Sequence, residues 1–340
     1  MKKPISIALS LLMILNLTAC VRLKTPAANA TMKTTEAPTA EPTPEPTPTE
    51  TPAPTDTPEP TKAPTPTPVP TEVPFDVIAA NAMAKLEQVR SIHMDIQLNM
   101  AFNVTVSMGE TPQSMPMNID VSCGMDSTRD PNVARLDLSL SAPGQEMEMR
   151  GLVYLVQDGT DTILYLSEDD GATWEKQTNP QSFPLPQSPA ATFHLFTDAG
   201  INIQKTGTAQ VNGRPATVYS GKVEGKYLQE VLSNAGAGEA LANSFGAEMA
   251  EAILLNPGDM DVTFMIDAEN GLPVRYVVDM TSALGNMLSA AFQQSMDGQS
   301  LVDAGITLEV PTAVLEIVLS QFDSIKLLQI PEAALNAPEA

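Results

Sequence analysis

The stretch IHMDIQLNMAFNVTV, residues 92–106, alternates apolar and polar side chains along its whole length. Its even positions carry Ile, Met, Leu, Phe or Val, and most of its odd positions carry His, Asp, Gln, Asn or Thr. Because successive side chains of a strand point to opposite faces, this pattern predicts one half-buried strand of about 50 Å, at about 3.3 Å per residue. So long a strand decides the fold, since it needs partner strands and a cover for its apolar face.

Further alternating segments supply those partners. Residues 115–125 carry apolar side chains at odd positions, residues 136–140 at even positions, and Met147 and Met149 begin a fourth strand. Shorter or mixed strands are predicted at 163–166, 201–211, 214–224, 262–266, 272–278 and 306–319. Asn212-Gly213 is typical of a two-residue hairpin, and Pro311 predicts a bulge or an edge position. The pattern indicates some ten antiparallel strands.

Helical periodicity occurs in three segments that can cover such a sheet. One helix is predicted over residues 76–90 with Asp76 as N-cap, and another over 284–297. A third, over 226–255, is interrupted near Gly236 and Gly238. Its apolar stripe is Leu241, Phe245, Met249 and Ile253. Because the strands alternate, we expect a water-exposed outer face and an α+β fold: a large curved antiparallel sheet, or half barrel, with helices packed on its concave face.

Composition divides the chain into three parts. Residues 1–20 combine two lysines with a short apolar run, as in a cleaved signal peptide. Their end, Leu17-Thr18-Ala19-Cys20, resembles the lipobox of bacterial lipoproteins, which implies a diacylglyceryl group on Cys20 and a membrane anchor. The alternative is an ordinary signal peptide with an incidental cysteine. Residues 75–340 are long enough to form one large domain.

Residues 21–74 contain 15 Pro and 15 Thr, a composition that favours extended polyproline II and predicts a disordered stalk. A docking site for a proline-recognition domain and an O-glycosylated spacer remain alternatives. Residues 75–340 contain 12 Lys or Arg against 34 Asp or Glu, a net charge of −22. Such a domain repels nucleic acid, which is excluded as a partner, and also anionic headgroups.

Little in the composition supports catalysis. Cys123 lies on an apolar face, which predicts a buried thiol. His93 and His194 have no second histidine at ligand spacing. Six aspartates in predicted turns lack the spacing of a calcium loop, so a solvated acidic rim is favoured over a calcium site. These are Asp126, Asp130, Asp158, Asp161, Asp169 and Asp170. We expect no catalytic residues, no metal and no cofactor.

Residues 167–174, SEDDGATW, match the Asp-box pattern of sialidase-type propellers. In that pattern an Asp side chain accepts backbone amides, Gly permits positive φ and Trp packs beneath the hairpin. A propeller repeats the motif at blade spacing, whereas this sequence has one copy. The motif therefore predicts a turn and not glycosidase chemistry.

Methionines concentrate in the first four predicted strands, nearly all in phase with the inner face. Flexible thioethers can line an adaptable apolar cavity, although a core that is merely rich in methionine gives the same pattern. Copper binding is disfavoured, because it needs thioethers on an exposed loop. The predicted cavity-lining residues are Met94, Met100, Met115, Met117, Met147, Met149, Phe245 and Met249.

Three segments resemble one family. A helix ending in Val89–Ile92, a Gly-Arg-Pro hairpin at Gly213–Pro215 and a late hairpin at Asp267–Pro273 are similar to those of LolA-like, LppX/LprG-type bacterial lipoproteins, including poorly characterised Gram-positive members. The resemblance implies a half barrel with a cavity for acyl chains and no universal catalytic residues. We therefore expect a noncatalytic lipoprotein on the extracytoplasmic face of a Gram-positive cell membrane that binds a hydrophobic or lipid ligand. The alternative is a fully packed module that docks another surface protein.

Overall fold

The computed structural model describes most of the predicted folded domain. Its described residues are 73–107, 112–144, 147–179, 202–234, 247–255, 257–293, 295–296, 299–300, 302 and 305–339. Cys20, most of the stalk, His194 and Phe245 lie outside these residues.

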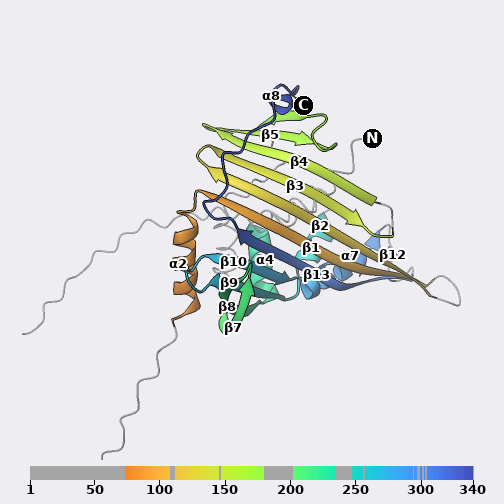
Figure 1. The fold of residues 1–340 in the computed structure, drawn as a ribbon. Coiled ribbons are helices and arrows are strands. Elements are labelled where there is room, and N and C mark those ends of the chain that lie inside the picture. Colours follow the sequence, from red (N-terminus) through yellow and green to blue (C-terminus); the bar gives the residue numbers. More distant parts are fainter. Residues whose placement is uncertain are drawn as a thin grey trace, which may run out of the picture. The chain divides into compact units, whose positions relative to one another are not determined.

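Eleven strands form one antiparallel sheet (Figure 1). Their order is β6-β5-β4-β3-β2-β1-β13-β10-β9-β8-β7, so the sheet is open, with β6 and β7 at its edges. The strands are β1 Ser91–Val106, β2 Gln113–Arg129, β3 Asn132–Ala142, β4 Met147–Asp158, β5 Asp161–Ser167, β6 Glu175–Thr178, β7 Gln204–Val211, β8 Arg214–Val223, β9 Met260–Asp267, β10 Pro273–Asp279 and β13 Ile306–Ser320. A separate pair joins β11 Ser295–Met296 to β12 Gln299–Ser300. The predicted large antiparallel sheet is confirmed.

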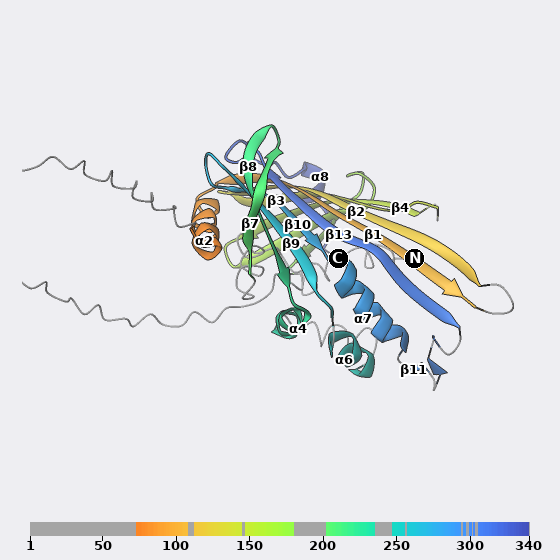
Figure 2. The same ribbon diagram turned by 90° about the horizontal axis from the view of Figure 1, so that it is seen from below.

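Three of the helices, α4, α6 and α7, lie together on one side of this sheet (Figure 2). The helices are α2 Phe75–Leu86, α4 Gly225–Asn234, α6 Ala247–Leu255, α7 Thr281–Gln293 and α8 Glu332–Leu335. Seen from below, α4, α6 and α7 gather on the same side, where α7 packs against β13 and α6 packs against α7 (Figure 2). The predicted helical cover of the concave face is confirmed. No helix among the described residues is long and apolar enough to cross a membrane.

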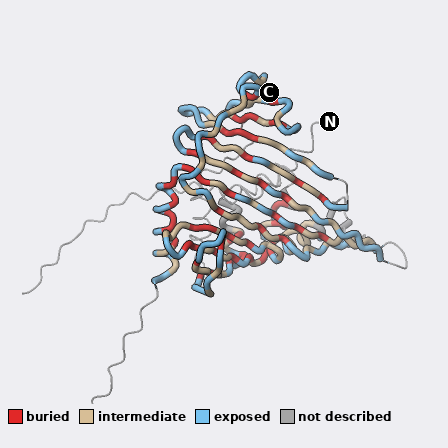
Figure 3. The backbone as a smooth tube through the Cα atoms, viewed as in Figure 1, coloured by how far each residue is buried: buried red, intermediate tan, exposed pale blue. Residues whose placement is uncertain are grey.

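The alternation of residues 92–106 determines which side chains face the helices. Met94 lies opposite Met125 of β2 and Leu319 of β13, and all three side chains are buried. We call this side the inner face; it contains the even positions of β1 and β3 and the odd positions of β2 and β4. Buried and exposed residues alternate along these strands (Figure 3).

Two local predictions from turn and breaker residues are confirmed. Asn212 and Gly213 have φ values of 51° and 76°, the left-handed pair that a tight hairpin needs between β7 and β8. Ala101 lies opposite Thr312 and Asn103 opposite Glu309, which leaves two residues of β13, one of them Pro311, opposite one of β1. This bulge accommodates the proline, because Pro has no N–H to donate to the ladder.

Helix boundaries differ from the predicted ones. Helix α2 begins at Phe75 after Pro74, so Asp76 lies in the first turn and the predicted N-cap is wrong. The helix ends at Leu86 because the chain must turn into β1 at Ser91. The helix predicted over 284–297 is α7, which begins at Thr281, where the Thr281 amide donates to Asp279 Oδ1 (2.9 Å).

The outer face of the sheet is not exposed to water along its whole width. At the β4–β6 end, the prediction of a water-exposed outer face is wrong. Here Tyr154, Tyr165 and Trp174 form an apolar cluster with Ala334 of α8. The C-terminal segment holds this cover in place, since the Lys176 amide donates to Pro338 O (3.1 Å). We call this the outer cluster; it seals strands that would otherwise expose aromatic side chains.

Candidate functional site

The inner face is closely packed near α2. The rung that contains Met94 continues through Met125, Leu136 and Val153, and each of these side chains is at most 6% exposed. Met100, the second predicted cavity residue of β1, is 8% exposed. Met94 and Met100 are therefore core residues, and the methionine-rich core accounts for them.

The same face opens toward the far ends of β1 and β2. Met115 lies opposite Val104 and is 55% exposed, and Met147, opposite Ala142, is 39% exposed. Met117 and Met149 lie between these and the core, half-buried and packed against it. We call this region the open apolar end: Val104, Met115, Met117, Met147, Met149 and Leu308.

Helix α7 provides a wall beside this region. The Met280 amide donates to Ala313 O (2.8 Å), and the Ala313 amide donates to Thr281 Oγ1 (3.0 Å), which fixes the start of α7 on β13. A Cβ added at Gly285 would lie 3.9 Å from Val310 Cβ, an ordinary van der Waals distance, so this turn of α7 lies directly against β13. Leu284, Met287 and Leu288 add half-buried apolar surface that the sequence analysis missed.

The structure places the predicted site residues unequally. It brings Met115, Met117, Met147 and Met149 to one end of the inner face, and Met94 and Met100 into the packed core. Met249 belongs to α6, which packs on α7, but its side chain lies outside the described residues, as do Phe245 and Cys20. For these three residues the assignments stay predictions.

Cys123 lies on the inner face in the core, as predicted, and is 2% exposed. Burial raises the pKa of its thiol to about 12, and the nearby carboxylates Asp137 and Asp95 add to this. The thiol is therefore protonated at neutral pH and is a poor nucleophile. Among the described residues, no group of three or more His, Cys, Asp or Glu side chains is arranged to hold a metal ion.

His93 lies on the polar outer face between two carboxylates. Its Nδ1 is 2.6 Å from Asp126 Oδ1, and its Nε2 is 3.2 Å from Asp95 Oδ1. Desolvation by burial lowers the His93 pKa, but the hydrogen bonds and charges of Asp126 and Asp95 together outweigh it, and the pKa is raised. This histidine stabilises strand pairing across β1 and β2.

The raised pKa predicts a pH-dependent stability. The His93 contribution is fully present below about pH 6.5, the ordinary pKa of histidine, and is lost as the pH rises through the folded-state pKa. We expect the free energy of unfolding, measured in urea, to fall by about 0.2–1 kcal/mol between pH 5.5 and 8. His93→Asn should remove most of this difference. The same slope in both proteins would contradict the assignment.

The Asp-box segment forms the predicted turn. Asp169 Oδ1 accepts the Thr173 amide (2.8 Å) and the Ser167 hydroxyl (2.8 Å), and Gly171 has a φ of 92°. The Thr173 hydroxyl also donates to Asp169, and these bonds lower the pKa of the Asp169 carboxyl. Trp174 Nε1 donates to Gly171 O (3.0 Å). The carboxylate is committed to the turn, so the motif has a structural role.

Comparisons with known proteins give structural likenesses and a family. LppX of Mycobacterium tuberculosis shares 11% identity over 75% of this chain and 98% of that chain, with a TM-score of 0.36. LprF of Mycobacterium bovis shares 13% identity over 76% of this chain and 96% of that chain, with a TM-score of 0.35. A third structure is a domain from Vibrio parahaemolyticus that is assigned to outer membrane lipoprotein sorting. It shares 9% identity over 77% of this chain and 95% of that chain, with a TM-score of 0.19.

The chain is thus similar to LppX-type and lipoprotein-sorting structures, the likeness that the sequence led us to expect. No curated protein matches the sequence. The sequence profile of the family of unknown function DUF6612 matches residues 75–339. The chain belongs to this family, DUF6612.

Proposed function

We propose that the domain binds a hydrophobic ligand of the cell envelope, such as an acyl chain, and has no catalytic role. In this proposal Cys20 anchors the chain to the extracytoplasmic face of the membrane, and residues 21–74 hold the domain away from it. The observation that carries the proposal is the open apolar end, where the inner face continues beyond its packed core.

Two physical properties suit this region to a flexible apolar ligand. A contiguous apolar surface left open to water has a free-energy cost that a bound apolar molecule removes. Its four methionines are unbranched and polarizable, so they adapt to chains of different shape. The ladder pairing keeps Val104, Met115 and Leu308 on one surface, next to each other.

A substitution at Met117 tests the proposal. Met117→Trp should fill the open apolar end and expel acyl-chain species that otherwise co-purify with the full chain, as measured by native mass spectrometry. The cost in stability should be small, because a half-buried site has room for the ring. Met265→Trp is the matched control: Met265 is also half-buried, but it lies on the outer face.

The opposite result has a clear form. Overpacking a full interior typically costs about 1–3 kcal/mol. If the wild-type chain carries no acyl species and Met117→Trp lowers the free energy of unfolding by this amount, the face is a closed core. The domain would then be an interaction module for another surface protein.

A further inference from the structure

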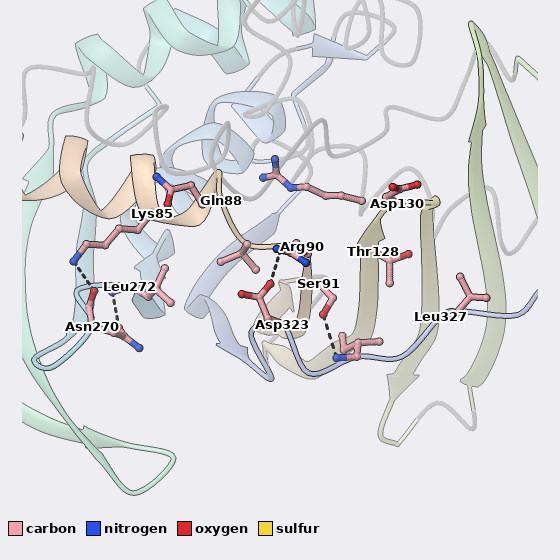
Figure 4. Close-up of a pocket in the computed structure, with 13 residues that line it drawn as sticks. Lys85, Gln88, Arg90, Ser91, Thr128, Asp130, Asn270, Leu272, Asp323 and Leu327 are labelled. Carbon is pink, nitrogen blue, oxygen red and sulfur yellow. Dashed lines mark hydrogen bonds between the residues drawn. The ribbon is translucent and has the colours of Figure 1, made fainter.

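A hollow lies at the α2 end of the sheet, the end opposite the open apolar end. Its volume is about 870 Å³, within the range of small-molecule pockets. The walls come from the end of α2, the start of β1, the β2–β3 turn, the β9–β10 turn and the segment after β13 (Figure 4). We call it the basic groove, because Lys85, Arg90 and Arg129 line it.

The positive charges of this groove are unusual in the domain. Of the 12 Lys and Arg in residues 75–340, all of which are described, seven lie within ion-pair distance of a carboxylate. The five without such a carboxylate partner among the described residues are Lys85, Arg90, Arg129, Lys205 and Lys326. Three of these five line the groove, and Lys326 lies between its wall residues Ile325 and Leu327. Elsewhere in this acidic domain, most Lys and Arg side chains are paired with a carboxylate.

Each basic side chain keeps donors for a ligand. Lys85 Nζ donates to Asn270 O (2.5 Å), as Figure 4 shows, which leaves two of its three protons. Arg129 Nη2 donates to Leu86 O (3.3 Å), which leaves four of the five N–H donors of its guanidinium. The Arg90 guanidinium has no hydrogen-bond partner among the described residues. The bonds of Arg90 are made by its backbone: its amide donates to Asp323 Oδ1 (2.6 Å), and its carbonyl accepts the Arg129 amide (2.9 Å).

The remaining lining gives the groove a small positive charge and an apolar wall. Asp130 and Asp323 are its acidic residues, so three cations face two carboxylates. Leu327 is 61% exposed, and Leu272 and Ile325 are half-buried. An anion with an apolar part matches both features.

We propose that the basic groove binds a phosphate group carried by a small, partly apolar molecule. Lys85, Arg90 and Arg129 come from the end of α2, the residue before β1 and the end of β2. A phosphate monoester presents three acceptor oxygens, whereas a carboxylate presents two, so it meets donors from several directions better. The net charge of −22 disfavours polyanions and anionic membrane surfaces, which leaves a small ligand with a single phosphate.

This inference does not rest on the proposed acyl-chain site. Lys85, Arg90 and Arg129 lie near the start of β1 and the end of β2, whereas Val104 and Met115 lie near the end of β1 and the start of β2. Met117→Trp should therefore leave binding at the groove unchanged. A negative result at one site therefore does not contradict the proposal for the other site.

Three probes of matched structure test the groove by calorimetric titration of the full chain in nonionic detergent. Hexyl phosphate carries both the phosphate and an apolar tail, inorganic phosphate lacks the tail, and hexanoate replaces the phosphate with a carboxylate. We expect hexyl phosphate to bind most tightly, with an affinity that falls as salt is added. Arg90→Gln should weaken its binding by about tenfold or more, because charge-assisted hydrogen bonds are lost.

Lys205→Gln is the matched control, since it removes from edge strand β7 a cation that has no carboxylate partner in the described part of the chain. It should bind hexyl phosphate like the wild type. Arg129→Gln is a second groove variant and should also weaken binding, and Arg90→Lys should restore part of it. Hexanoate binding as tightly as hexyl phosphate would overturn the phosphate assignment, and equal binding of inorganic phosphate would overturn the role of the apolar wall. No binding of any probe, or unchanged binding in both groove variants, would overturn the proposal.

Discussion

Trp174→Ala should lower the free energy of unfolding by about 3–5 kcal/mol, the cost typical of removing a buried aromatic ring. Trp174 is 7% exposed, and its ring lies 5.8 Å from the ring of Tyr154 on the outer face of the sheet. Trp174 belongs to the outer cluster together with Ala334, which is fully buried. The loss would therefore loosen the C-terminal segment as well as the turn. Urea unfolding of the full chain measures the change.

Two controls separate the ring from its hydrogen bond. Trp174→Phe keeps an aromatic ring but not the Nε1 donor to Gly171 O, so it should cost less than the alanine variant. Asp169→Asn should weaken the turn while leaving the outer cluster in place. An unchanged unfolding midpoint in Trp174→Ala, together with loss of an activity toward sugars, would revive the glycosidase reading of the Asp-box motif.

Periodicity predicted the sheet well because each strand carries its own evidence. The alternation of residues 92–106 predicted both the length of β1 and the side of β1 that is buried. Asn212-Gly213 predicted the hairpin between β7 and β8. The cover of the outer face could not be predicted, because residues 325–339 show no clear hydrophobic periodicity. They attach to strands of the sheet through contacts between residues that are distant in sequence. Thr178 and Glu339, for example, are joined by a hydrogen bond of 2.9 Å.

The candidate sites show the same limit. Methionine spacing correctly placed Met94 and Met115 on one face, but it contains no information on how far along β1 and β2 the helical cover reaches. That depends on how α7 packs against β13, which the strand pattern does not encode. The basic groove was missed altogether, since residues such as Lys85 and Leu327 are brought together only by the completed fold.

Cys20→Ala should move the protein from the membrane fraction to the soluble fraction, or block its processing. In the proposed anchor, two acyl chains on Cys20 each bury many methylene groups at about 0.8 kcal/mol per methylene. One chain gives only marginal, reversible binding, whereas two give stable attachment. Loss of the thiol removes the attachment point, so the effect should be nearly complete. Detergent phase partitioning and labelling with an alkyne fatty acid measure it.

The chain provides its own control for this experiment, because Cys123 is the only other cysteine. Cys123 is buried in the core with a raised thiol pKa, so it is inaccessible to acylation in the folded domain. Cys123→Ala should therefore keep both the label and the membrane partitioning. If Cys20→Ala stays in the detergent phase and keeps the label, the Leu17–Cys20 segment is not a lipobox and attachment must come from another part of the chain.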